Sequence, residues 1–315
     1  MVCPVCRGDS ILLRRLRAQD IARELAEHLG TPPQGLGGTD YEEYRCSRCN
    51  LEFAAPPVPG SDVFYGWATQ HPGYYPDGRW EWDYVLGVLR VQLMASVRGL
   101  DVGCGTGAFI TRALSLGNCH MTGVDSTPSV VVGLRQRGLD AHCMTIDSFA
   151  AMPGNAGSFD VVTAFQCLEH VPDPCGFVSS ALRCLREGGR AFVSTPYSPT
   201  ALECHVWDPL NHPPHHLTRW NTKSLAMLAD AVGASVQFHM PRPVRAIWRV
   251  LFALRAMRSG KPAGPDPHPI GTLLRNPWRT LTWWREQRAR EHVQGYGVAP
   301  SDILAEFQRL PGRNA

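Results

Sequence analysis

Two short cysteine motifs carry the clearest chemical signal in the sequence. Cys3 and Cys6 form one Cys-x-x-Cys pair, and Cys46 and Cys49 form a second. Each pair can offer two thiolates from one tight turn, and four thiolates in a tetrahedron make a closed structural zinc site. We therefore expect these four cysteines to hold one zinc ion. Four free thiols are the alternative, and a redox role is disfavoured because neither pair opens a helix in a thioredoxin-like pattern.

A glycine-rich segment can bring the backbone close to a ligand. Gly103, Gly105 and Gly107 follow a short apolar run and precede a helical stretch, and glycine permits such an approach. The spacing also fits the dinucleotide pattern G-x-G-x-x-G/A. Asp101 favours a different ligand, because its carboxylate would repel a pyrophosphate but attract the ammonium and sulfonium of S-adenosylmethionine. Asp125 ends the next strand and can hold ribose hydroxyls in either case. An aspartate that caps an empty glycine turn is the remaining alternative.

Three histidines follow predicted strands and offer a general base. His170 comes after FDVVTAF, and His215 and His216 belong to the proline-containing segment NHPPHHL. Histidine has an unperturbed pKa of about 6.5, which suits proton removal from an acceptor. The alternatives are a structural hydrogen bond for His170, and helix-entry capping or packing for the other two. A metal site made of His205, His212, His215 and His216 has only weak spacing in its favour.

Residues 85–240 alternate short apolar runs with helical stretches. The runs GLDVG, HMTGVD, FDVVTAF and RAFVST end in glycine, aspartate or turn residues, and helical patterns lie at 106–116, 128–137, 174–186 and 221–232. Such alternation is typical of a parallel sheet with helices on both faces. Ligands bind such sheets at the carboxyl ends of the strands, where both the glycine segment and the histidines are expected.

The remaining segments differ from this core in composition. The chain divides into a zinc-ribbon-like module at 1–53, a linker and aromatic segment at 54–84, the core at 85–240, a basic helical insert or lid at 241–300, and a final strand with the tail at 301–315. Apolar spacing in the module predicts a helix from Leu16 to Leu29. Three prolines favour a linker at 54–60, because proline interrupts regular structure.

The insert carries the positive charge of the chain. Residues 242–290 contain ten arginines and Lys261 against Asp266 and Glu286, a local charge of +9, whereas the whole chain carries +3. Helical patterns near 244–258 and 277–290 mix these arginines with tryptophans. We favour a lid that offers arginines to an anionic acceptor. A peripheral membrane contact through 244–290 and a packed helical addition are the alternatives.

Composition excludes several classes of protein. With 44% hydrophobic and 19% charged residues, the 315-residue chain is typical of a globular protein rather than a disordered or fibrous one. No apolar run approaches the roughly 18 residues of a membrane-spanning helix. The segment MVCPVCRGDS lacks the features of a signal peptide, so we expect a cytoplasmic protein. The 11 cysteines are then thiols or metal ligands rather than disulfides.

The motifs DVGCGTG, LEHV and LREGG, in this order, resemble those of class I S-adenosylmethionine-dependent methyltransferases of the ubiquinone and natural-product type. The resemblance covers residues 63–240 and the final strand. It implies an α/β fold with a Rossmann-like seven-stranded sheet whose last strand is antiparallel. By position it implies Gly103, Gly105 and Gly107 around the methionine portion, Asp125 on the ribose, Asp147 and Ser148 near adenine, and Gln166 and Cys167 on the methionyl side. The long insert between the last two strands departs from many relatives.

These observations together predict methyl transfer from S-adenosylmethionine to a small-molecule acceptor in natural-product, glycan or quinone-like metabolism. His170, His215 and His216 are the candidate catalytic residues. An RNA methyltransferase with a zinc ribbon is the alternative, but residues 1–53 are not markedly basic and no base-methylation motif occurs. A non-catalytic cofactor-binding partner subunit is a second alternative, which the intact glycine segment disfavours. The sequence indicates neither the methylated atom nor the oligomeric state.

Overall fold

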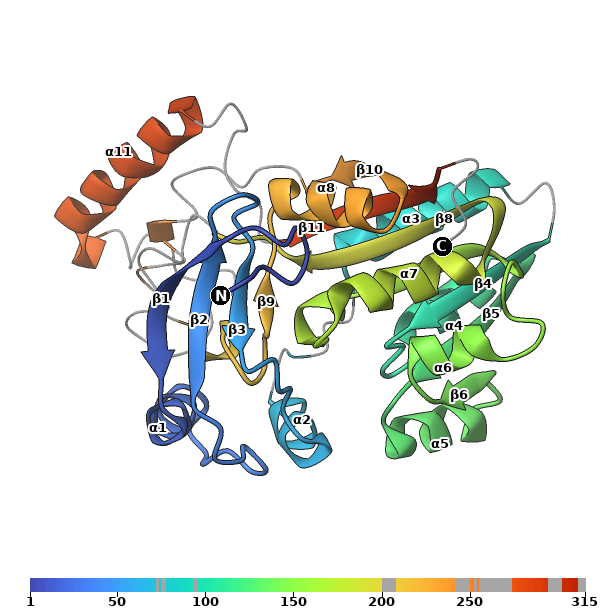
Figure 1. Cartoon of the computed structure of the whole chain (residues 1–315), viewed down its shortest axis with the longest axis horizontal. Coiled ribbons are helices and arrows are strands. Elements are labelled where there is room, and N and C mark those ends of the chain that lie inside the picture. The colour runs from blue at the N-terminus through green and yellow to red at the C-terminus, as the bar shows by residue number, and fades with distance from the viewer. Residues whose placement is uncertain are drawn as a thin grey trace.

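The computed structural model describes residues 1–71, 74, 78–92, 96–199, 208–241, 250–251, 254, 274–293 and 302–310. These residues form a large α/β unit with a smaller antiparallel sheet packed beside it (Figure 1). The large unit contains the predicted core, and the smaller sheet contains the N-terminal cysteine motifs.

The large unit is built on a seven-stranded sheet of order β10-β11-β8-β7-β4-β5-β6. Its strands are β4 (Val97–Val102), β5 (Cys119–Asp125), β6 (Ala141–Cys143), β7 (Phe159–Phe165), β8 (Leu185–Pro196), β10 (Ala234–His239) and β11 (Asp302–Arg309). Strands β4 to β8 pair in parallel, whereas β11 runs antiparallel to both of its neighbours. The predicted Rossmann-like fold class with an antiparallel last strand is therefore confirmed.

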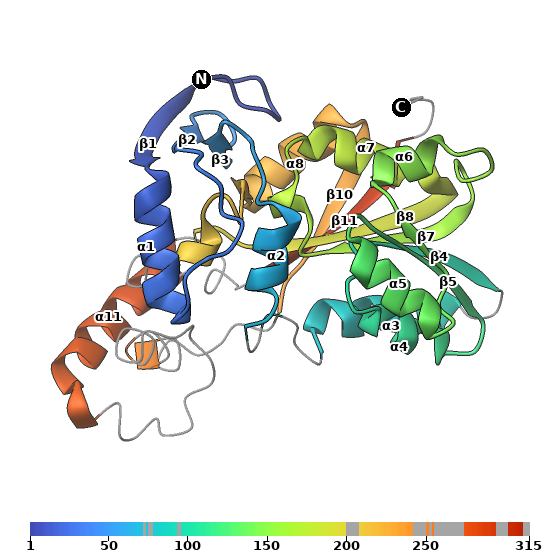
Figure 2. The same ribbon diagram turned by 90° about the horizontal axis from the view of Figure 1, so that it is seen from below.

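Helices cover both faces of this sheet (Figure 2). One face carries α3 (Trp80–Gln92), α4 (Ala108–Leu114) and α5 (Pro128–Gln136), and the other carries α6 (Ile146–Ala151), α7 (Pro174–Cys184) and α8 (Thr222–Ala231). Local signals set their starts: Asp173 accepts a hydrogen bond from the Gly176 amide, and Asn221 forms a capping box with Ser224. Strands that are covered on both faces are apolar along their length, which explains why apolar runs in the sequence predicted them.

The strand order reverses at β4, which lies between β5 and β7. The chain leaves β4 to build β5 and β6 on one side and then crosses to β7 on the other. In open parallel sheets the ligand crevice lies outside the carboxyl ends of the strands at such a reversal. The glycine segment follows β4, and a short 3-10 helix η1 (Leu168–His170) follows β7.

The smaller sheet has the order β1-β2-β3-β9 and is antiparallel throughout. It consists of β1 (Ser10–Leu16), β2 (Tyr41–Cys46), β3 (Glu52–Ala55) and β9 (Thr218–Arg219), with α1 (Ala18–Leu29) between β1 and β2. The helix predicted from Leu16 is wrong at its start, because Leu16 ends β1 and pairs with Tyr41. Strand β3 continues to Ala55, two residues into the segment expected as a linker.

Strand β9 connects the two units, because it belongs to the smaller sheet although its residues lie beyond β8 in the chain. The two units also share one hydrophobic core. Buried Cys3, Cys46 and Leu51 belong to the same cluster as Leu100 of β4 and Trp220 after β9. The N-terminal module is therefore packed into the body of the protein.

The insert is described only in part. Helix α11 (Pro277–Val293) occupies the helical pattern expected at 277–290, and its Trp278 is 79% exposed. The helix expected at 244–258 lies outside the described residues, apart from Val250, Leu251 and Leu254. No helix within the described part of the chain combines the length and apolar character needed to cross a bilayer.

Candidate functional site

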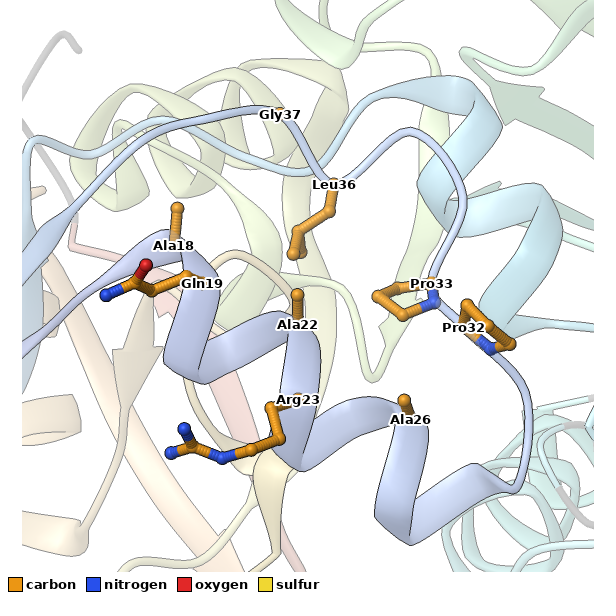
Figure 3. A pocket seen from close by; sticks show the side chains of 9 residues that line it. All are labelled: Ala18, Gln19, Ala22, Arg23, Ala26, Pro32, Pro33, Leu36 and Gly37. Carbon is orange, nitrogen blue, oxygen red and sulfur yellow. The ribbon is translucent and has the colours of Figure 1, made fainter.

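A ligand could enter either of two hollows that the described residues line. The first lies between α1 and residues 32–37 (Figure 3). It is lined by Ala18, Gln19, Ala22, Arg23, Ala26, Pro32, Pro33, Leu36 and Gly37. The only charged group in this lining, Arg23, already pairs with Asp20 at 2.9 Å. This pocket therefore offers little chemistry.

The second hollow is a cavity of about 1130 Å³ at the carboxyl edge of the large sheet. The loops after β4, β5, β6 and β7 line it, together with α2 (Asp62–Ala68) and the segment that contains His215 and His216. It lies at the reversal of strand order, where a ligand is expected. One cavity thus joins the glycine segment to the candidate catalytic histidines.

The glycine segment adopts a backbone that other residues would strain. Gly103, Gly105 and Gly107 have φ values of 65°, 48° and 69°. A Cβ atom on Gly103 would lie 2.3 Å from the Cys167 sulfur, and one on Gly107 would lie 2.5 Å from a methyl group of Leu134. Gly103 and Gly105 line the cavity, whereas Gly107 lies behind them at the start of α4. Glycine is needed here for close packing as well as for backbone conformation.

Two aspartates flank the glycine segment. Asp101 is buried, its Oδ1 accepts a hydrogen bond from the Thr163 hydroxyl at 2.7 Å, and burial raises the pKa of its carboxyl to about 7. Asp125 accepts bonds from the amides of Gly105 (3.0 Å) and Thr127 (2.9 Å), so its carboxylate ties two loops together. Paired carboxylates at this place favour a positively charged ligand over a pyrophosphate.

The two residues expected near adenine separate in the structure. Asp147 lines the cavity, in the first turn of α6. Ser148 is exposed, and its hydroxyl accepts a hydrogen bond from Thr145 instead. Successive residues of a helix point about 100° apart, so one of the pair faces the cavity and the other does not.

The two residues expected on the methionyl side both line the cavity. Gln166 has a φ of 55°, unusual for a residue other than glycine, and its amide group lies 3.3 Å from carboxylate oxygens of Glu81 and Asp302. The Cys167 sulfur packs against the glycine segment, 3.4 Å from the Val102 carbonyl oxygen. The chain therefore turns sharply after β7, which brings the residues that follow back over the cavity.

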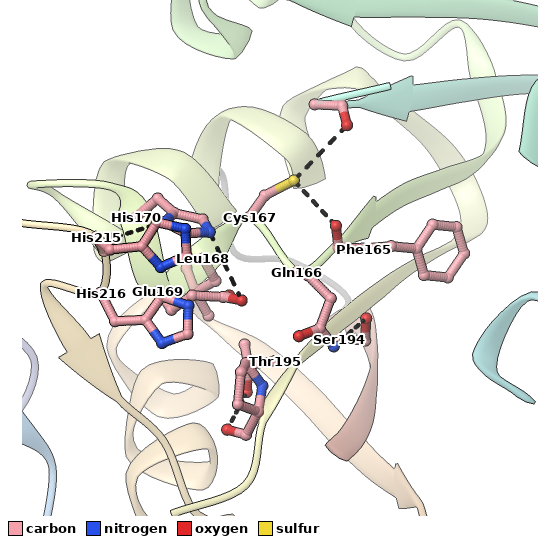
Figure 4. Close-up of polar contacts among 12 residues, drawn as sticks. Phe165, Gln166, Cys167, Leu168, Glu169, His170, Ser194, Thr195, His215 and His216 are labelled. Atoms are coloured by element: carbon pink, nitrogen blue, oxygen red, sulfur yellow. Dashed lines mark hydrogen bonds and ion pairs between the residues drawn. The ribbon is translucent and has the colours of Figure 1, made fainter. Parts of the chain in front are cut away.

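His170, His215 and His216 form one cluster (Figure 4). One ring nitrogen from each lies within 4.8 Å of the others, and all three residues line the cavity. His170 ends η1, and the other two follow a second 3-10 helix, η2 (Pro209–Asn211). The Leu217 amide donates to the Glu169 carbonyl oxygen at 2.7 Å, and this bond joins the two segments.

Hydrogen bonds determine which nitrogen of each ring carries the proton. The Nδ1 atoms of His170 and His215 lie 2.5 Å and 2.7 Å from the carbonyl oxygens of His215 and Leu210. A carbonyl oxygen only accepts, so both Nδ1 atoms must be protonated. The His216 Nδ1 lies 2.9 Å from the Asn211 side-chain oxygen, which implies the same tautomer. Each neutral ring therefore keeps its lone pair on Nε2.

Burial changes the acidity of these rings. It lowers the pKa of His170 to about 4 and that of His215 to about 3, and it lowers the pKa of His216 well below its ordinary value. The charged form of a histidine is disfavoured away from water. The expected titration near neutrality is therefore wrong for these three residues: all are neutral at physiological pH.

Three further side chains lie next to the cluster. Glu169 is 1% exposed, neither of its carboxylate oxygens has a hydrogen-bond partner, and burial raises its pKa to about 8. The Tyr74 hydroxyl donates to the His215 Nε2 at 2.9 Å, and the Tyr65 hydroxyl donates to the His215 carbonyl oxygen at 3.3 Å. The dense aromatic residues at 61–84 were the available signal for the two tyrosines.

Of the other histidines weighed for a metal, His212 does not join this cluster. The His212 Nδ1 lies 2.6 Å from the Glu43 carboxylate of β2, a buried contact between the small sheet and the histidine segment. His205 lies outside the described residues. The cluster that forms includes His170 instead, which comes from a different loop.

The four N-terminal cysteines converge as expected. Their sulfur atoms all lie within 4.8 Å of one another, with 3.7 Å between Cys3 and Cys49 and 3.3 Å between Cys6 and Cys46. A tetrahedral zinc ion with Zn–S bonds of about 2.3 Å would separate its sulfurs by about 3.8 Å. The geometry and the donor set fit zinc.

The two cysteine turns also have matching backbones. Arg7 and Asn50, each directly after the second cysteine of its pair, have φ values of 59° and 60°. Each turn closes with a hydrogen bond from this residue to the first cysteine, at 3.2 Å to Cys3 and 3.0 Å to Cys46. Two copies of one turn present two sulfurs each, as a ribbon-type metal site requires.

A family model described as a methyltransferase domain matches residues 40–237, more than half of the chain. The chain belongs to this methyltransferase family. The match begins within the small sheet, just before β2, and ends in β10, so it contains the glycine segment, the cavity and the histidine cluster. The predicted membership of the class I methyltransferases is confirmed.

Similar sequences of known function belong to ubiquinone biosynthesis. The ubiquinone biosynthesis O-methyltransferase of Marinobacter nauticus is 38% identical over 108 residues, which are 32% of this chain and 45% of that protein. The enzyme of the same name from Methylococcus capsulatus is 33% identical over 135 residues, 40% of this chain and 56% of that protein. The chain spans about half the length of the curated relatives it matches.

Among solved structures, an S-adenosylmethionine-dependent methyltransferase from Archaeoglobus fulgidus has a TM-score of 0.47 at 15% identity, covering 72% of this chain and 94% of that one. A plantazolicin methyltransferase has a TM-score of 0.46 at 13% identity, covering 73% and 84%.

Proposed function

We propose that this methyltransferase-family protein transfers the methyl group of S-adenosylmethionine to a small-molecule acceptor. The observation that supports this most is the single cavity, which joins the glycine segment and its two aspartates to a cluster of three histidines, of which His215 is buried and the other two are half-buried. A cofactor site and a polar acceptor site that share one enclosed space are what methyl transfer needs, because the reacting atoms must be held in line.

In the proposed arrangement, the cofactor lies along the glycine segment. Asp101 faces its positive charge, Asp125 accepts bonds from the ribose hydroxyls, and Asp147 lies toward adenine. Gln166 and Cys167 border the methionyl side. Bound S-adenosylmethionine supplies an electrophilic methyl carbon, whose bond to sulfur breaks as the acceptor bonds to it. The protein has to position both molecules and exclude water.

The acceptor is proposed to lie against the histidine cluster. The neutral rings of His170, His215 and His216 offer Nε2 lone pairs that can accept a hydrogen bond from an acceptor hydroxyl and so orient it, although their lowered pKa values make them weak bases. Tyr65 and Tyr74 hold the segment that carries His215. An oxygen acceptor is consistent with the O-methyltransferase names of the similar sequences.

A small acceptor fits the site better than RNA. The three histidines are enclosed, since burial is what lowers their pKa values, and a base within a nucleic acid would have to be extruded to reach them. The basic insert, proposed as a lid at 241–300, stays a candidate for contacts with an anionic acceptor. A non-catalytic role as a partner subunit would not account for the histidine cluster.

We also propose that Cys3, Cys6, Cys46 and Cys49 hold a structural zinc ion. The core shared by the two units suggests a role for this zinc ion. It would stabilise β2 and β3, which contact the segment that carries the histidines. The chain would then form one catalytic unit with an insert. Its proposed segments are 1–53, 54–84, 85–240, 241–300 and 301–315.

Calorimetry with S-adenosylhomocysteine and with NAD tests the cofactor. Binding of the former and no binding of the latter is expected, and a preference for NAD would contradict the proposal. Transfer of an isotope-labelled methyl group is then measured on hydroxylated small molecules and, separately, on RNA. His216→Gln should lower turnover by roughly 10²-fold without changing cofactor affinity, as expected for loss of a group that orients the acceptor. His142→Gln, a surface change on β6, is the control. Methylation of RNA alone would favour the alternative function.

A further inference from the structure

The histidine cluster has features that methyl transfer by itself does not require. Three neutral rings from two loops bring their nitrogens within 4.8 Å of one another inside the cavity. The ring pairs have centroid distances of 4.7 Å, 4.9 Å and 4.6 Å. The three rings thus place one potential ligand nitrogen each at one point of the cavity.

The outer nitrogen of each ring is anchored. The Nδ1 atoms of His170, His215 and His216 donate to the His215 carbonyl, the Leu210 carbonyl and the Asn211 side chain. Metal-binding histidines almost always donate their second nitrogen to such an acceptor, because this bond holds the tautomer and the ring direction. The three Nε2 atoms are therefore set up as ligands.

A buried carboxylate lies beside the cluster without a partner. Glu169 is 1% exposed, its two oxygens make no hydrogen bond, and its Oε1 lies 3.9 Å from the His170 Nε2 (Figure 4). A buried acidic group without a partner is costly and calls for an explanation. A cation at the three imidazoles would supply the missing partner.

We propose that His170, His215 and His216 form a site for a divalent transition-metal cation through their Nε2 atoms, with Glu169 beside it and one side open to the acceptor. This inference deepens the proposed function, on which it rests for the acceptor. It is separate from the four-cysteine site, which is closed. Imidazole ligands suit zinc, iron, cobalt and nickel rather than magnesium or calcium.

The fit requires only a small contraction. Zn–N bonds are about 2.0–2.1 Å, which places tetrahedral ligand nitrogens about 3.3 Å apart. The rings would therefore move together from their present separation. The Tyr74 hydroxyl now donates to the His215 Nε2 and would give up that bond when the metal binds.

A metal here would define the acceptor class as an oxygen nucleophile that can ligate it. An acceptor hydroxyl bound to a cation ionises more readily and releases its proton to water. The oxygen lone pair then forms the bond to the methyl carbon while the carbon–sulfur bond breaks, and that electron pair remains on sulfur. Three histidines and an open position are the common plan of catalytic metal sites.

Cobalt titration of the full chain loaded with a single equivalent of zinc, which the four thiolates take up first, tests the site without any acceptor. Zinc occupies the four cysteines, so added Co²⁺ should bind as one further equivalent per chain. Its absorption should show ligand-field bands without thiolate charge transfer, because imidazole has no such transition. His216→Gln should weaken this binding at least about 100-fold, and Asn211→Ala, which removes the anchor of that ring, by about 10–100-fold. His142→Gln is the matched control and should bind cobalt normally.

Affinity for S-adenosylhomocysteine, measured on every variant, reports whether the fold and the cofactor site are intact. If His216→Gln does not fold, Asn211→Ala decides the test. No cobalt beyond the cysteine site, thiolate bands, or equal loss in the control would overturn the metal site. Cobalt binding by a wild-type chain that binds no S-adenosylhomocysteine would instead overturn the proposed function and leave the metal site standing.

Discussion

At the scale of single residues, burial decides what each candidate group can do. Asp101 and Glu169 are both acidic side chains, yet burial brings the pKa of one to about 7 and of the other to about 8. His170 shifts the other way, to about 4, because its charged form is the protonated one. From residue type alone these groups would have ordinary pKa values, and burial in the cavity shifts those values.

Replacement of Gly103 by alanine should abolish close approach of the cofactor. The new Cβ would lie 2.3 Å from the Cys167 sulfur, on a backbone with a φ of 65°. We expect at least about tenfold weaker binding of S-adenosylhomocysteine by calorimetry. This loss is separate from the backbone strain of about 1–2 kcal/mol that alanine would have at this φ. Gly117→Ala controls for strain, because Gly117 has a φ of 95° but nothing within 4 Å of an added Cβ. Equal affinity in the two variants would contradict this role.

Cofactor affinity should depend on pH through Asp101. Its raised pKa of about 7 means that the free protein carries a neutral carboxyl below that pH. A cationic ligand favours the carboxylate, so affinity should rise about tenfold per unit as pH increases toward 7 and level off above it. Calorimetry with S-adenosylmethionine between pH 6 and 8.5 measures this. In Asp101→Asn the dependence should vanish and the affinity should be lower throughout; an unchanged pH profile would show that another group is responsible.

At the scale of elements, the small sheet positions the histidine segment. Glu43 of β2 is buried against His212, and Arg219 of β9 lies 3.3 Å from Glu52 of β3. The Ala54 amide, also in β3, donates to the Leu217 carbonyl oxygen at 2.8 Å. These contacts hold both ends of the segment that carries His215 and His216 against the small sheet.

Glu43→Gln should loosen these contacts. The Glu43 carboxylate accepts a hydrogen bond from the neutral His212 ring and pairs with Arg14 at 2.6 Å, and loss of its buried charge costs about 1–3 kcal/mol. We expect that loss in the free energy of unfolding, measured by urea denaturation, together with a lower rate of methyl transfer. Glu42→Gln, next along β2 but paired with Arg15 on an exposed face, should change stability little. Similar losses in both variants would mean that the buried contact is not special.

At the scale of the whole molecule, the cysteine site and the methyltransferase sheet share a core. Cys3, Cys46 and Cys49 are fully buried in the cluster that contains Leu100 and Phe307 of the large sheet. An isolated ribbon would unfold by itself when its metal is lost. Here, loss of the metal should destabilise both units, because they share one core.

Cys46→Ser should therefore lower the melting temperature of the whole chain in one transition. Structural zinc contributes about 10–16 kcal/mol in small peptides, as much as the entire stability of a typical domain. Scanning calorimetry and zinc analysis measure the two effects together, and Cys143→Ser, an exposed cysteine outside the cluster, is the control. A separate low-temperature transition, with cofactor binding retained after it, would show instead that the module unfolds independently.

Sequence alone determined the elements and the family, because these depend on local patterns. Apolar runs predicted strands that are buried on both faces, and the helical stretches predicted at 128–137, 174–186 and 221–232 begin within one residue of α5, α7 and α8. The paired cysteines and the glycine segment were recognisable because each lies in one short turn. Only the tertiary structure joined His170 to His215 and His216, turned Ser148 away from the cavity and left Glu169 without a partner. These facts depend on contacts between residues far apart in the chain and on burial, which no local pattern records.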